Sequence, residues 1–177
     1  ISVHDADIQV LFDELRDQII DNINIGDLKD LHSLTINCKR CPNLGNGNLP
    51  IGNLVDPDVI FVTDRSLEDW PLDFLNILSE AGLSVSRSAL TFAIRCNSNT
   101  VEETVLKNCS NYLYSEIQML TPKLIIPLGS VASSLFLDSI KVSENHGTIF
   151  WSGPWAIMPV YSLGYLAKRE NADKEII

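Results

Sequence analysis

Short, mostly apolar runs alternate along the chain with longer runs that have helical spacing. The apolar runs are typical of strands that are buried on both faces. They lie at residues 58–64, 89–95, 123–129 and 155–161. Helical spacing occupies residues 69–81, 101–120 and 130–137. Strands that alternate with helices predict an α/β fold, here a three-layer α/β/α arrangement around a four-stranded parallel sheet.

Local signals place the ends of two predicted helices. Asp69 is the expected N-cap of the helix at 69–81, and Gly82 is the glycine expected just beyond its end. Thr100 and Glu103 have the spacing of a capping box for the following helix. Because parallel sheets bind ligands beyond the carboxyl ends of their strands, we expect the functional residues there.

The chain is expected to form a single domain over residues 1–177, which is long enough for a substantial core. Residues 1–35 are expected to form an acidic N-terminal helical segment, in which residues 5–21 have the spacing of an amphipathic helix. Residues 36–170 then form the core. Residues 42–57 are rich in glycine and proline and are expected to be loop.

The formal net charge of −10 gives no general attraction for phosphate. Residues 1–37 carry eight acidic and two basic side chains, so the acidity is concentrated there. A local basic patch could still be assembled by the fold. Its candidate members are Lys39, Arg40, Arg65, Arg95, Lys168 and Arg169.

No apolar run has the length of a membrane span, and no signal peptide is visible at the start. These absences favour a cytoplasmic protein with reduced cysteines, and a nucleoid or a viral replication site would be a narrower location. The chain begins with Ile1, which fits a processed product or one domain or subunit of a larger assembly.

The chain has four cysteines, at Cys38, Cys41, Cys96 and Cys109. Cys38 and Cys41 form a C-x-x-C turn, which points two sulfurs at one spot, as zinc sites and iron–sulfur clusters require. Cys96 closes the second predicted strand, and Cys109 lies on the inward face of the helix at 101–120. Spacing alone leaves a metal site, two disulfides and four unrelated buried thiols as alternatives.

The order of these motifs resembles the uracil-DNA glycosylase superfamily in its iron–sulfur branch, which includes family 4 and phage DNA polymerase-related domains. The resemblance covers residues 36–170. It is carried by Cys38-Lys-Arg-Cys41, Val59-Ile-Phe-Val62, Arg95-Cys96, Cys109-Ser-Asn-Tyr-Leu113 and Pro122-Lys-Leu-Ile-Ile-Pro-Leu-Gly129. It implies the fold of that family and a [4Fe–4S] cluster held by all four cysteines, with zinc as the alternative metal.

The catalytic positions implied by the resemblance depart from the family pattern. A G-E-x-P-G loop follows the first strand in the family, whereas this chain reads Thr63-Asp64-Arg65-Ser66 and keeps only a carboxylate at Asp64. Leu72 stands where a phenylalanine stacks on uracil, and Phe92 stands where an asparagine reads the edge of the base. Ser162 lies where the family has a histidine that stabilises the departing uracil anion. These four residues would form the former base pocket.

The sequence therefore predicts a catalytically degenerate iron–sulfur domain with a binding or architectural role. Its expected partner is DNA or a DNA-processing protein complex for replication or repair, a viral one included, and no membrane. One alternative is a divergent active glycosylase, for which Asp64 and His146 are the weak catalytic candidates. The other alternative is an acidic protein-interaction module or DNA mimic.

Overall fold

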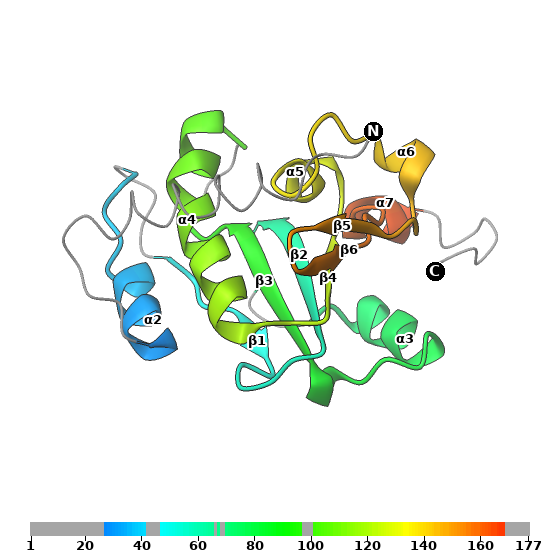
Figure 1. Cartoon of the computed structure of the whole chain (residues 1–177), viewed down its shortest axis with the longest axis horizontal. Coiled ribbons are helices and arrows are strands. Elements are labelled where there is room, and N and C mark those ends of the chain that lie inside the picture. The colour runs from blue at the N-terminus through cyan, green and yellow to red at the C-terminus, as the bar shows by residue number, and fades with distance from the viewer. Residues whose placement is uncertain (1–26, 42–46, 66, 68–69, 97–100, 169–177) are drawn as a thin grey trace.

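The structure is a computed structural model that describes residues 27–41, 47–65, 67, 70–96 and 101–168 (Figure 1). Its helices are α2 (Leu28–Ile36), α3 (Leu72–Glu80), α4 (Glu103–Leu120), α5 (Ser130–Ser134), α6 (Val142–Asn145) and α7 (Leu163–Lys168), with a 3₁₀ turn η1 (Val85–Arg87). Its strands are β1 (Ile51–Gly52), β2 (Val59–Arg65), β3 (Ser88–Ile94), β4 (Leu124–Pro127), β5 (Phe150–Ser152) and β6 (Trp155–Ile157). The amphipathic helix predicted over residues 5–21 lies outside the described residues.

The described strands form one sheet in the order β1-β3-β2-β4-β6-β5. The inner strands β3, β2, β4 and β6 run parallel, which confirms the predicted parallel core. Two further strands that the sequence did not predict, β1 and β5, pair antiparallel at the two edges. Both are too short to show a hydrophobic period, and β1 lies in the glycine- and proline-rich stretch expected to be loop.

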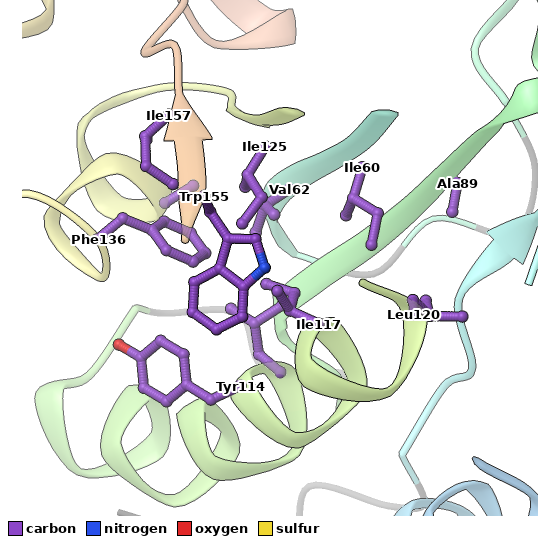
Figure 2. Close-up of a cluster of buried hydrophobic side chains, with 12 residues drawn as sticks. Ile60, Val62, Ala89, Tyr114, Ile117, Leu120, Ile125, Phe136, Trp155 and Ile157 are labelled. Atoms are coloured by element: carbon purple, nitrogen blue, oxygen red, sulfur yellow. The ribbon is translucent and has the colours of Figure 1, made fainter. Parts of the chain in front are cut away.

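Helices cover both faces of this sheet, as the three-layer prediction requires. On one face, α4 and α5 pack on a cluster in which the Trp155 ring lies between Phe136 and Ile117 (Figure 2). On the other face, Phe74 of α3 packs edge-on against Phe61 of β2, with 5.0 Å between the ring centroids. Successive side chains of β2 point to opposite faces and join the two clusters in turn. The strand is therefore buried on both faces, which explains its near-continuous apolar sequence.

The predicted helix ends differ from the observed ones by a few residues. Helix α3 begins at Leu72 with Pro71 as N-cap, and the proposed cap Asp69 lies outside the described residues. Gly82 has a φ of +70°, as expected for a glycine after a helix end. Helix α4 begins at Glu103 with Glu102 as its N-cap, so Glu103 is the first helical residue and the described part does not show the capping box.

No helix in the described part of the chain is both long enough and apolar enough to cross a bilayer.

Two tryptophans near the β5–β6 turn provide a test of the core on the α4 face. Trp155 is 7% exposed within the cluster of Figure 2, whereas Trp151 on β5 is 68% exposed. Trp155→Ala should lower the free energy of unfolding by about 3–5 kcal/mol, because it leaves a large cavity. The matched change Trp151→Ala should stay within about 0.5 kcal/mol of wild type. Urea unfolding of both variants measures this, and equal losses would contradict the packing described here.

Candidate metal centre

All four cysteines line one cavity beside the carboxyl end of β3. The cavity itself is small, about 10 Å³, and it is partly open to solvent. Its other lining residues are Thr35, Gly47, Arg95 and Tyr112. Three separate segments therefore bring Cys38, Cys41, Cys96 and Cys109 to the wall of one cavity.

The C-x-x-C turn follows directly from the end of α2. The N–H of Asn37 donates to the Ser33 carbonyl at 3.2 Å, and its side-chain amide donates to the same oxygen at 2.9 Å. The N–H of Cys38 then donates to the Thr35 carbonyl at 3.2 Å, which keeps the chain close to the helix end. These bonds satisfy backbone carbonyls of the last turn and set the direction in which the turn leaves the helix.

Helix α4 also contacts the C-x-x-C turn, through Asn108, which directly precedes Cys109. The side-chain amide of Asn108 donates to the Arg40 carbonyl at 3.4 Å and lies 3.3 Å from the Cys41 sulfur. The guanidinium of Arg40 lies 5.0 Å from the centroid of the Tyr112 ring, which is a cation–π contact. The turn is thus fixed from α4 next to Cys109.

Gly47 lines the cavity, and its neighbour Asn48 connects this part of the chain to the end of β3. The Arg95 carbonyl accepts hydrogen bonds from the backbone N–H and the side-chain amide of Asn48, at 2.9 and 2.8 Å. A Cβ atom at Gly47 would stand 2.4 Å from the Thr35 carbonyl oxygen, so a glycine is required at this close approach.

A buried carboxylate lies behind the cavity. Glu116 of α4 receives the guanidinium of Arg95 through two hydrogen bonds, of 3.2 and 2.7 Å, and also the hydroxyl of Thr91. The Nε2 of His32 on α2 lies 3.1 Å from the same carboxylate. Burial alone would raise the pKa of Glu116, but Arg95, His32 and Thr91 together hold it well below its usual range. Arg95 is therefore a core residue and was wrongly placed in the candidate basic patch.

Burial disfavours the thiolate form of two of the four cysteines, Cys96 and Cys109. Burial first, and the neighbouring Cys109 second, raise the pKa of Cys96 to about 12. Burial also raises the pKa of Cys109. All four are free thiols, so the disulfide alternative is not what the structure shows. Four thiols line one cavity, and in two of them burial disfavours the negatively charged thiolate. This arrangement fits a cationic group, which would stabilise the thiolates. Within the described ranges, no three His, Cys, Asp or Glu side chains are already grouped to hold a metal ion.

The residues predicted to form a former base pocket differ in their burial and in the face of the sheet on which they lie. Asp64 is half-buried at the end of β2, whereas Phe92 is 0% exposed within the cluster on the α3 face. Side chains alternate along β2, so Asp64 lies on the same face of the sheet as Ile60 and Val62, opposite to Phe92. Leu72 is the first residue of α3 and is 78% exposed.

Ser162 and His146 lie near the carboxyl ends of β4 and β6. A Cβ atom at Gly129 would stand 2.9 Å from the Ser162 Cβ, so Ser162 packs against the turn that follows β4. The His146 ring lies 4.5 Å from the Tyr161 ring, which stacks at 4.3 Å on Tyr165. Burial lowers the pKa of His146, so it is neutral at pH 7. Sequence reasoning missed this aromatic row, because its members have no common spacing.

Two comparisons with known proteins place the chain. A sequence model of the family described as Uracil DNA glycosylase superfamily matches residues 58–176. A Type-4 uracil-DNA glycosylase of Thermotoga maritima is 24% identical over 160 residues, covering 79% of this chain and 83% of the relative. The matched range of the family model contains Cys96 and Cys109 but begins after Cys38 and Cys41.

Thiol alkylation tests the burial of Cys96. In metal-free protein at about pH 8, Cys96 should react with iodoacetamide on the order of a thousandfold more slowly than in the same chain unfolded in urea, because the thiolate is the nucleophile. Its rate should keep rising about tenfold per pH unit beyond pH 9, where an ordinary thiol levels off. Peptide mass spectrometry reports the rate at each cysteine. Equal rates for the folded and unfolded chains would contradict this environment.

Proposed function

The chain belongs to the uracil-DNA glycosylase superfamily, and from this membership we propose that it is an iron–sulfur member that binds DNA without excising uracil. Its role is then binding or architectural, within an assembly that replicates or repairs DNA. The observation that carries this proposal is the contrast between two places in the fold. Four thiols surround one cavity, whereas the position expected to read the base is filled by the buried ring of Phe92.

Cys38, Cys41, Cys96 and Cys109 would hold the group as thiolates, with no cysteine of the chain left over. A [4Fe–4S] cluster is supported by the likeness to a Type-4 uracil-DNA glycosylase and by the resemblance to the iron–sulfur branch. Zinc is the second candidate, because four thiolates also suit a structural zinc ion. When bound, the group supplies a cross-link between the C-x-x-C turn, β3 and α4, and no chemical step is assigned to it.

The loss of excision follows from what a glycosylase has to do. The enzyme extrudes a base, reads its polar edge and stabilises the charge that develops on the leaving group. Phe92 offers a ring and no hydrogen bond, so the edge of a uracil beside it would lose about 1–3 kcal/mol for each polar group left unpaired. Losing one preorganised donor to the leaving anion costs on the order of 10²–10³ in rate, and Ser162 carries no imidazole.

DNA as the partner is supported by the family and by the aromatic row. Tyr165 is exposed, and its ring continues the stack of Tyr161 and His146 at the carboxyl edge of the sheet. Nucleobases stack on such rings regardless of their sequence. The net charge of −10 opposes phosphate binding over the whole surface, so contact would be confined to this edge.

A divergent active glycosylase is the second candidate, because Asp64 keeps a carboxylate at the end of β2. A carboxylate at the carboxyl end of a strand could orient a water molecule toward a sugar. This alternative requires that base reading be taken over by residues other than Phe92.

Uracil excision separates the two candidates. Wild type and Asp64→Asn should both give only background abasic sites on single- and double-stranded oligonucleotides that contain uracil, with the Thermotoga maritima relative as positive control. Wild type should still bind single-stranded DNA, and binding should weaken as salt rises.

Two results would contradict the proposal. The first is abasic-site formation by the wild type that Asp64→Asn abolishes, which would identify an active enzyme. The second is DNA binding that is absent at all salt concentrations, which would favour the acidic interaction module or DNA mimic.

A further inference from the structure

The carboxylate of Glu116 connects three elements of the fold: α4 and β3, which deliver Cys109 and Cys96, and α2, which leads into the C-x-x-C turn. Glu116 lies on α4, seven positions after Cys109 and therefore on the same helix face. Arg95, which binds it through two hydrogen bonds, directly precedes Cys96. His32 lies on α2, and its Nε2 contacts the Oε1 of Glu116. Cys38 follows two residues after the end of this helix. One side chain thus contacts all three elements.

The backbone of Arg95 extends this connection to the loop between the C-x-x-C turn and β1. Its carbonyl accepts both hydrogen bonds of Asn48, whose neighbour Gly47 lines the thiol cavity. The guanidinium of Arg95 also donates to Thr91 at 3.0 Å, and Thr91 donates in turn to Glu116. The side chain of Arg95 is therefore fixed from two directions, and so is the end of β3 from which Cys96 departs.

From these contacts we propose that Glu116 and Arg95 are positioning residues for the metal centre, which hold the four thiols at one cavity before any metal arrives. This inference rests on the proposed iron–sulfur centre and adds to it the residues that prearrange the site. Neither side chain is proposed to touch the metal. The pair acts on the relative placement of β3, α2 and α4, which no single cysteine can fix.

The full burial of the pair explains why it is suited to this role. Glu116 is 0% exposed and Arg95 is 1% exposed, so neither charge can turn toward water if the elements shift. A buried ion pair adds little to net stability compared with apolar residues of the same size, but it tolerates only arrangements in which its hydrogen bonds are made. Its value here is the selection of one arrangement of the three cysteine-bearing segments.

The test compares variants by how they take up and retain the metal. Glu116→Gln keeps the shape of the side chain and removes its charge. The double variant Arg95→Met, Glu116→Met removes both charges and should fold at least as stably as Glu116→Gln. Tyr114→Phe is the matched control. It removes a partly buried hydrogen bond of the same helix, which the Tyr114 hydroxyl donates to the Leu135 carbonyl at 2.6 Å, and Tyr114 does not line the thiol cavity.

Each protein is purified anaerobically, and its iron and sulfide per chain and the rate of iron loss to a chelator are measured alongside its thermal unfolding. Both variants of the pair should lose iron roughly 10–100-fold faster than wild type, the range seen when the supporting contacts of metal ligands are removed. Tyr114→Phe should lose iron at the wild-type rate even if its melting temperature falls.

The outcomes distinguish this inference from the proposed function. Wild-type protein that retains iron, together with a double variant that folds and retains it equally well, would overturn the positioning role alone. Iron loss from Tyr114→Phe that is faster in proportion to its loss of stability would do the same, because it would show that any destabilisation releases the metal. Wild-type protein with no bound metal would overturn the proposed metal centre and this inference with it.

Discussion

The buried ion pair between Arg95 and Glu116 is the interaction on which the arrangement of the cysteine-bearing segments depends. Because both side chains are inaccessible to water, the pair is stable only if β3 and α4 meet in one register and α2 brings His32 to the same carboxylate. That register also brings the end of β3 beside Cys109 and the end of α2 beside both. The gathering of four thiols around one cavity thus follows from the hydrogen bonds that the buried carboxylate of Glu116 requires.

The thiol cavity and the position expected to read a base differ in their chemistry. At the cavity, burial disfavours thiolate charge in Cys96 and Cys109, which a bound cation would reverse. At the position expected to read the base, Phe92 lies in an apolar cluster with Phe61 and Phe74 and offers no hydrogen-bonding group. Under the proposed function, the fold would keep a cross-link through its cysteines without the excision chemistry, because Phe92 does not line the thiol cavity.

The parallel core could be predicted from the sequence, because apolar runs are strong local signals. The expectation that four cysteines share one site came from the resemblance, because their spacing alone left disulfides and unrelated thiols open. The edge strands β1 and β5 could not be predicted, since two or three residues show no period. Arg95 was misassigned because a basic residue at a strand end is usually exposed. One signal was available: Cys109, Tyr112, Leu113 and Glu116 share a helix face, and an acid on an apolar face requires a buried partner.

Anomalous diffraction at the iron edge, from crystals of protein purified without oxygen, tests the central claim most directly. The account predicts an iron signal inside the cavity, with the sulfurs of Cys38, Cys41, Cys96 and Cys109 as its ligands. A zinc signal at the same place would keep the site and change the metal. An iron signal elsewhere, or a sulfur of one of these cysteines directed away from it, would contradict the account.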